Sequence, residues 1–158
     1  MDAITPENLK TMFEHGVRQY PQECCGMLFS NGGVHQATNI QQQLHEQNPE
    51  VYERGADMGY AFSISDIKLL ANSFETPNPA VVIYHSHPDV GAYFSEEDKS
   101  KALFCGEPVY PVSYLVLDIR KGAPFGAKLF HFFDSDFHCT ETFDEEGRRV
   151  NQLRTMST

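Results

Sequence analysis

The spacing of apolar positions changes several times along the chain, and these changes divide it into helices and strands. A first helix is predicted from the N-cap Thr5, with a proline directly after it, to the helix-ending Pro21. Its apolar residues recur at helical spacing: Leu9, Met12, Phe13 and Val17. Two more helices are predicted, from Ser63 or Ser65 to about Phe74 and from Ser95 to about Phe104.

Short apolar runs bounded by turn residues predict strands. The turn sequence Asn31-Gly32-Gly33 predicts a hairpin between residues 24–30 and 34–40. The run Ala80-Val81-Val82-Ile83-Tyr84 lacks polar alternation, which predicts a central strand buried on both faces. Further strands are predicted over residues 60–62, 112–118 and 127–133, and residues 121–124 lie in the connection between the last two. Residues 41–58 are polar without a clear period, so we expect a long loop there.

These elements predict an α+β fold in a single domain. We expect a mixed, mostly antiparallel sheet flanked by about three helices. The length of 158 residues suits one domain, which we place at residues 1–138. Residues 139–158 are polar and charged, and we expect them to form a weakly held tail.

Composition narrows the function classes. The formal net charge is -10, from 12 Lys and Arg against 22 Asp and Glu, and no basic cluster occurs. We therefore expect no nucleic-acid partner. No long apolar run or signal-peptide pattern is present, so we expect no membrane association and a cytoplasmic location. The four cysteines lack a Cys-x-x-Cys pair and are interpreted as reduced thiols, with two disulfides as the less favoured alternative.

Candidate metal ligands follow the predicted central strand. Side chains at alternate strand positions share a face, so His85 and His87 can converge on one ion. Asp98 follows after a stretch long enough for a loop and one helical turn. Three protein ligands leave a fourth position for water, which is typical of catalytic zinc. The same residues also fit a chance histidine pair and a helix-capping box in which Ser95 is the N-cap.

The combined spacing resembles a known family. The chain reads His-x-His-Pro-x6-Ser-x-x-Asp from His85 to Asp98, and Pro-x-Glu-x-Cys-Gly from Pro21 to Gly26. Both patterns are similar to those of the JAMM zinc metalloproteases (also called MPN, JAB or Mov34), in their compact prokaryotic form. The resemblance covers roughly residues 5 to 135, and the predicted element order is similar to the family fold.

The resemblance implies a role for each matching residue. His85, His87 and Asp98 would bind one catalytic Zn²⁺ per chain. Glu23 would act as general acid and base for the attacking zinc-bound water. Ser95 would hydrogen-bond the oxyanion of the tetrahedral intermediate. The implied substrate is a ubiquitin-like or sulfur-carrier protein, cut after its C-terminal Gly-Gly as a peptide or isopeptide. Ubiquitin-activating-like and conjugating-like enzymes are the implied further partners.

Alternatives remain open at this level. The chain also fits a non-catalytic MPN scaffold or interaction module, or a peptidase of the phage tail-assembly type. Ser86 is interpreted as a solvent or loop hydroxyl, with support of the metal ligands as the less favoured alternative. Cys25 is interpreted as a small buried hydrophobe, with a nucleophile as the less favoured alternative. The remaining histidines have no partner at metal spacing and are assigned to surface or strand positions: His15, His35, His45, His131 and His138.

Overall fold

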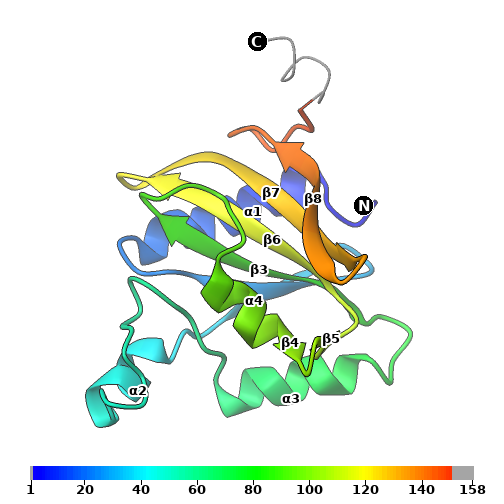
Figure 1. Cartoon of the computed structure of the whole chain (residues 1–158). Coiled ribbons are helices and arrows are strands. Elements are labelled where there is room, and N and C mark those ends of the chain that lie inside the picture. Colours follow the sequence, from blue (N-terminus) through cyan, green and yellow to red (C-terminus); the bar gives the residue numbers. More distant parts are fainter. Residues whose placement is uncertain (1, 151–158) are drawn as a thin grey trace.

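The computed structural model describes residues 2–150. In order along the chain the elements are α1 (Pro6–Gln19), β1 (Cys25–Phe29), β2 (Val34–Ala37), α2 (Gln41–Gln47), α3 (Ile64–Ser73), β3 (Ala80–Pro88), α4 (Glu96–Ala102), β4 (Leu103–Phe104), β5 (Glu107–Pro108), β6 (Ser113–Arg120), β7 (Ala123–Phe133) and β8 (Asp136–Phe143). Six strands form one twisted sheet, and β4 and β5 form a separate small hairpin (Figure 1).

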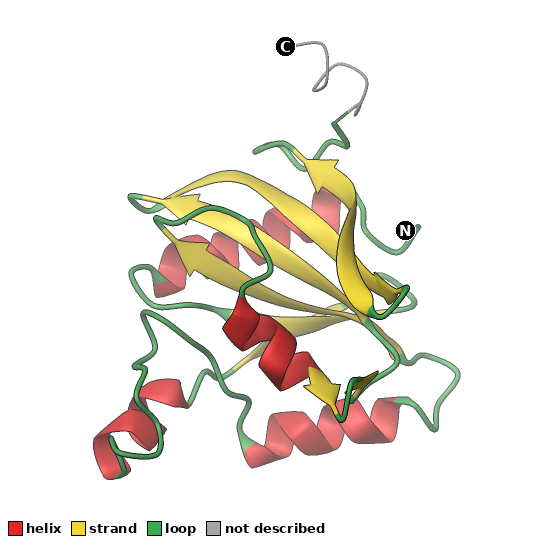
Figure 2. Ribbon diagram, in the orientation of Figure 1, coloured by secondary structure: helices red, strands yellow, loops and turns green. Residues whose placement is uncertain are grey.

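The sheet order is β2-β1-β3-β6-β7-β8. Only the central pair β3 and β6 is parallel, and the other neighbours are antiparallel. Helix α1 covers one face, while α3 and α4 lie on the opposite side (Figure 2). This arrangement confirms the predicted α+β fold with a mixed, mostly antiparallel sheet. The described part of the chain has four helices, since α2 adds one to the three that were predicted.

Helix α1 packs on the sheet through a stripe that differs in one position from the prediction. Leu9, Met12 and Phe13 are buried, as predicted, but Val17 is 37% exposed and Gly16 faces the sheet instead. A Cβ at Gly16 would lie only 3.0 Å from the Ile119 side chain. The helix therefore approaches the sheet so closely that a larger residue at that position would press against Ile119. The buried face, residues 9, 12, 13 and 16, follows the helical period.

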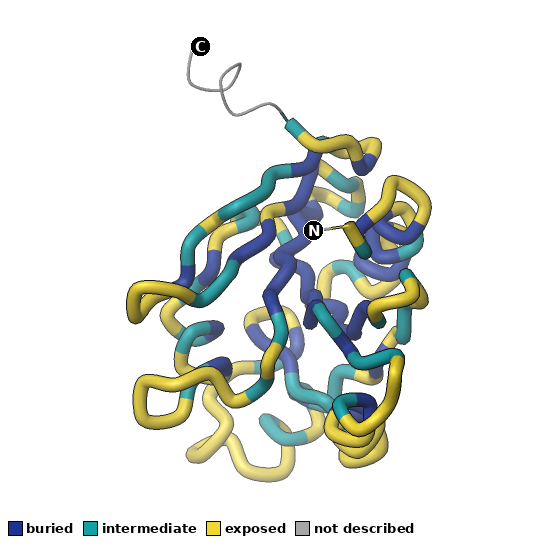
Figure 3. The backbone as a smooth tube through the Cα atoms, turned by 90° about the vertical axis from the view of Figure 1, so that its right-hand side faces the viewer, coloured by how far each residue is buried: buried dark blue, intermediate teal, exposed yellow. Residues whose placement is uncertain are grey.

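A second apolar cluster lies on the other face of the sheet. Its buried members come from the sheet, from α3 and α4 and from the loop before α4: Met27, Leu70, Ala80, Ile83, Phe94, Ala102, Tyr114, Val116, Phe130 and Phe137. Because both faces are covered, residues 82–87 of β3 are all buried. The prediction of a central strand is confirmed, and the buried backbone in Figure 3 runs through the middle of the molecule.

Three predicted boundaries were wrong. Residues 41–47 form α2 rather than loop, and only 48–63 connect it to α3. The predicted strand 60–62 is reduced to one bridge between Asn39 and Phe62. Strand β8 continues through Cys139 to the buried Phe143, so the start of the predicted tail belongs to the sheet. The end of that tail, residues 151–158, lies outside the described residues.

Within residues 2–150, no helix combines the length and apolar character that crossing a membrane would require. All four cysteines are unpaired thiols, as predicted.

Candidate metal centre

The two histidines of the His-x-His pattern lie at the end of β3. Strand alternation turns His85 and His87 to the α3/α4 face, and both are buried. The ring of Tyr60 stacks on His85 with centroids 4.7 Å apart, and Tyr93 contacts His87 edge-on at 4.9 Å. Ser86 points the other way, and its buried Oγ accepts a hydrogen bond from the Cys24 amide at 2.8 Å. The prediction of a solvent or loop hydroxyl for Ser86 was wrong.

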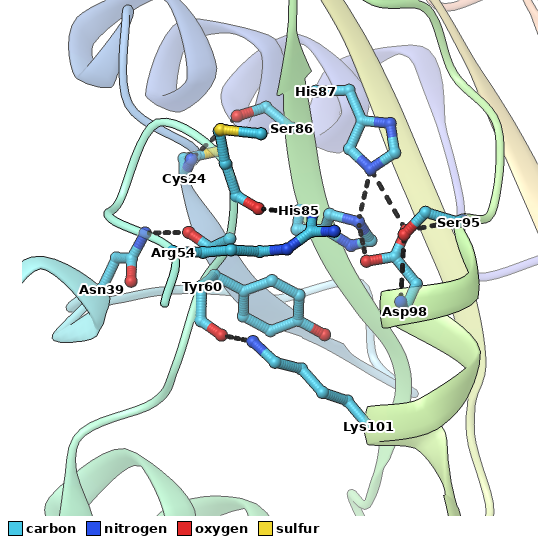
Figure 4. A network of polar contacts seen from close by, with 12 residues as sticks. Cys24, Asn39, Arg54, Tyr60, His85, Ser86, His87, Ser95, Asp98 and Lys101 are labelled. Atoms are coloured by element: carbon cyan, nitrogen blue, oxygen red, sulfur yellow. Dashed lines mark hydrogen bonds and ion pairs between the residues drawn. The ribbon is translucent and has the colours of Figure 1, made fainter. Parts of the chain in front are cut away.

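Asp98 reaches both histidines from the first turn of α4. Its Oδ1 lies 3.1 Å from His85 Nε2, and its Oδ2 lies 3.1 Å from His87 Nε2. The two Nε2 atoms are themselves 3.1 Å apart. Figure 4 shows the three side chains pointing at a common centre. Ser95 and Asp98 also form the capping box of α4. The segment is therefore a helix cap and, at the same time, part of the candidate metal site.

This triangle fits a metal ion. Tetrahedral zinc with bonds of about 2.0–2.1 Å holds its ligand atoms roughly 3.3 Å apart, close to the separations observed here. Burial opposes charge on Asp98, but the charges and hydrogen bonds of the histidines hold its pKa far below the usual range. Burial lowers the pKa of His85, which favours the neutral ring, whereas burial is outweighed at His87, whose pKa is raised by the hydrogen bond and charge of Asp98. An ionised carboxylate and a neutral imidazole are the forms that bind metal.

Glu23 lies beside the triangle, just before β1. It is 6% exposed, and a carboxylate oxygen lies within 4.8 Å of the ligand nitrogens of His85 and His87. Its Oε1 is buried without a hydrogen-bond partner among the described residues. Burial raises the pKa of Glu23 to about 8, and the neighbouring Asp98 charge contributes in the same direction. A buried acceptor with no partner is costly, which points to a missing ligand or water at this position.

Backbone and side-chain contacts hold Glu23 in place. Its amide donates to the Ala56 carbonyl at 2.7 Å, and its carbonyl accepts from Asn39 Nδ2 at 2.8 Å. Asn39 Nδ2 also donates to the Gly59 carbonyl, next to the Tyr60 that stacks on His85. The loop after α2 thus supports both the candidate base and a candidate ligand.

A pocket of about 110 Å³, which we call the metal pocket, is lined by Glu23, His87, Ser95 and Asp98. Its lining also includes two cations and two acids: Arg54, Lys101, Asp57 and Glu97. Lys101 Nζ lies 4.5 Å from the centre of the Tyr60 ring and donates to the Tyr60 carbonyl. A larger depression, about 710 Å³, lies between α1, the start of β7 and residues 145–146, and contains none of these residues.

The structure brings together all five residues singled out from the sequence: Glu23, Ser95, His85, His87 and Asp98. Sequence reasoning missed Asn39, Tyr60 and Lys101. Only Lys101 had a local signal, since it follows Asp98 by three residues and so lies near it on one helix face. Asn39 and Tyr60 reach the site through tertiary contacts.

The other candidate groups do not join the cluster. His15 is buried, against the prediction of a surface position, and its Nδ1 lies 2.7 Å from the Tyr84 hydroxyl. Burial raises the pKa of the Cys24 thiol to about 12 and raises that of Cys25 further. Thiols held neutral are poor nucleophiles, which agrees with the assignment of Cys25 as a buried hydrophobe.

Comparisons with known proteins agree with this geometry. Residues 5–123 match the family model described as prokaryotic homologs of the JAB domain. A solution structure of a protein from Salinibacter ruber is 31% identical, with a TM-score of 0.52 over 86% of each chain. A second, from Desulfitobacterium hafniense, is 19% identical, with a TM-score of 0.56 over 85% of this chain and 86% of that one.

A JAB1/MPN domain protein from Archaeoglobus fulgidus covers 92% of both chains at 14% identity, but its TM-score of 0.39 is too low to bear on the fold. No curated protein matches the sequence. The family model spans most of the chain and includes Glu23, both histidines and Asp98. The chain therefore belongs to the family of prokaryotic JAB-domain homologs.

Proposed function

We propose that this chain is a zinc-dependent peptidase or isopeptidase that hydrolyses the bond after the C-terminal Gly-Gly of a ubiquitin-like or sulfur-carrier protein. The observation that carries the proposal is the placement of Glu23. Its buried, unpartnered carboxylate oxygen lies beside a triangle of three metal-binding atoms. A glutamate that closed the site as a fourth ligand would be lost together with the ion on substitution, whereas a general base can be replaced without loss of the ion.

His85, His87 and Asp98 would hold the ion, which would supply Lewis-acid polarisation of the carbonyl and acidify a water molecule. Glu23 takes a proton on its free carboxylate oxygen and delivers it to the leaving amine nitrogen. A pKa raised by burial brings this carboxyl group nearer to neutral pH, where proton transfer in both directions is most effective.

Ser95 is placed to stabilise the oxyanion. Its Oγ accepts a hydrogen bond from the Asp98 amide at 3.0 Å, so its own proton is still available for donation. The helix-capping bond fixes the hydroxyl at the rim of the metal pocket. A preorganised donor of this kind typically contributes about 10²–10³ in rate.

The metal pocket is narrow, and this supports Gly-Gly as the sequence next to the cut bond. At about 110 Å³ it is much smaller than the depression beside α1, which favours small residues beside the scissile bond. Glycine is the residue that permits such close backbone approach. Ubiquitin-like and sulfur-carrier proteins end in this sequence, and their activating-like and conjugating-like enzymes are the proposed functional partners.

Metal content and one substitution test the proposal. The purified chain should bind about one zinc and cleave a Gly-Gly fusion of a ubiquitin-like protein. Glu23→Gln should keep the zinc but lose about 10²–10⁴ in rate, the usual contribution of general acid-base catalysis. Glu14→Gln, on the exposed side of α1, is the matched control and should keep wild-type activity.

Two results would contradict the proposal: zinc well below one per chain, or full activity in Glu23→Gln. The first would favour the non-catalytic MPN interaction module. Cleavage restricted to a phage tail-assembly protein would favour the alternative peptidase class.

A further inference from the structure

A second depression adjoins the metal pocket and has no role in the chemistry described above. It measures about 390 Å³ and lies between the loop after β3 and the hairpin of β6 and β7, so we call it the hairpin pocket. Val90 and Tyr93 line both pockets, so the two adjoin. The other residues used below are Asp118, Arg120, Phe125 and Lys128. In Figure 1 the loop after β3 and the β6–β7 turn lie together at one end of the sheet.

Large apolar side chains project into water around the hairpin pocket. Val90 is 61% exposed, Tyr93 52% and Phe125 55%. Exposed apolar side chains that gather along one depression can mark a binding site. The neighbouring charges are Asp118, Arg120 and Lys128, so the pocket has no strong single charge.

The walls of the hairpin pocket are fixed before any ligand binds. The Arg120 guanidinium makes two hydrogen bonds to the Asp118 carboxylate, at 3.0 and 2.9 Å, and lies 5.1 Å from the Phe125 ring centre. The opposite wall is anchored through Asp89, whose amide donates to the Ile119 carbonyl at 2.7 Å. A preformed pocket loses less entropy on binding than a mobile one.

The metal residues lie between the hairpin pocket and another depression. The latter, about 300 Å³ beside α2, shares Arg54, Glu97 and Lys101 with the metal pocket. Its wall is more heavily charged, since it combines Glu53 and Glu97 with Arg54 and Lys101. A polypeptide cut at the metal centre would thus meet chemically different surfaces on its two sides.

Distance decides which part of a substrate can fill the hairpin pocket. Tyr93 contacts His87 directly, so this wall begins within one or two residues of the scissile bond, at about 3.3 Å per extended residue. Two glycines on the acyl side have no side chains to occupy it. Only the segment that leaves with the amine can place a large side chain there.

We propose that the hairpin pocket binds an aromatic or large aliphatic side chain of the substrate, one or two residues beyond the scissile bond on the amine side. This rests on the proposed peptidase function. Burial of such a side chain against Phe125 and Tyr93 should raise kcat/KM by about tenfold over glycine.

Cleavage of a peptide series tests the preference. The peptides share one sequence with Gly-Gly before the cut, and a single Phe or Gly occupies each of the next two positions in turn. At one position the zinc-loaded chain should cleave the Phe peptide about tenfold better than the Gly peptide. Phe125→Ala should reduce this ratio to near one. Phe104→Ala, which removes a more exposed phenylalanine outside the pocket, should keep it. Equal ratios in wild type and Phe125→Ala would overturn the inference.

Binding to zinc-loaded Glu23→Gln separates the two proposals. Adding the Phe peptide should shift the backbone amide resonances of residues 90–93 and 124–127, and the Gly peptide should do so at least tenfold more weakly. Such shifts without any cleavage by the wild-type chain would support the pocket and contradict the peptidase. If both peptides leave these resonances unmoved, the hairpin pocket is not the binding site, whatever the activity.

Discussion

Replacement of Asn39 by alanine tests the support of the candidate centre. The Asn39 side chain makes four hydrogen bonds: Nδ2 donates to the carbonyls of Glu23 and Gly59, and Oδ1 accepts from the amides of Gln41 and Ala61. These bonds join the start of β1, the start of α2 and the residues on both sides of Tyr60. Asn39→Ala removes all four and leaves the backbone groups to water.

The expected loss of stability follows from these contacts. A hydrogen bond contributes about 0.5–1.5 kcal/mol net, so four give roughly 2–6 kcal/mol. Asn39 is only half-buried and water can replace some partners, which places the expected loss near 3 kcal/mol. Asn78, which is also half-buried, accepts only two hydrogen bonds, so Asn78→Ala should cost only about 1 kcal/mol.

Urea unfolding followed by circular dichroism measures both variants against the wild type. Zinc content and cleavage rate should be measured on the folded Asn39→Ala chain, because a displacement of about 1 Å at the site can cost about 10²-fold in rate. The reasoning is refuted if Asn39→Ala is no less stable than Asn78→Ala and retains full activity.

Three further measurements test other parts of the molecule. Burial, with a smaller contribution from the Arg18 charge, lowers the pKa of His15 in the folded chain to about 4. As the pH falls, the unfolded chain is protonated at this histidine before the folded chain is, so the unfolding free energy should fall between about pH 6.5 and 4. His15→Gln should lose that part of the pH dependence. A Cβ at Gly26 would overlap the His35 carbonyl oxygen and the Tyr84 ring, so Gly26→Ala should lower the free energy of urea unfolding by about 3 kcal/mol. The control Gly59→Ala should be nearly neutral, because its Cβ would lie 3.7 Å from the nearest atom, in the Gln41 side chain. Removal of zinc with a chelator should lower the apparent unfolding free energy by about 4 kcal/mol, compared with the chain in zinc at a thousandfold excess over Kd. An unchanged melting temperature would argue against metal at this centre.

Local sequence signals sufficed for most of the fold. The N-cap Thr5, the turn Asn31-Gly32-Gly33 and the apolar run before His85 act within a few residues, and each correctly predicted its element. Predictions were wrong where the pattern of apolar residues carried no signal. The polar residues 41–47 form a helix although only Gln41 is buried, and the tail residue Phe143 is buried in the sheet.

The sequence by itself determined which groups can bind metal, because the His-x-His alternation and the capping box fix their relative directions over short distances. It did not determine how these groups are supported. Asn39, Tyr60 and Lys101 reach the centre through loop and helix packing, and no spacing rule connects them to His85. The burial that raises the pKa of Glu23 is likewise a property of the packed chain, since desolvation depends on every neighbour that excludes water.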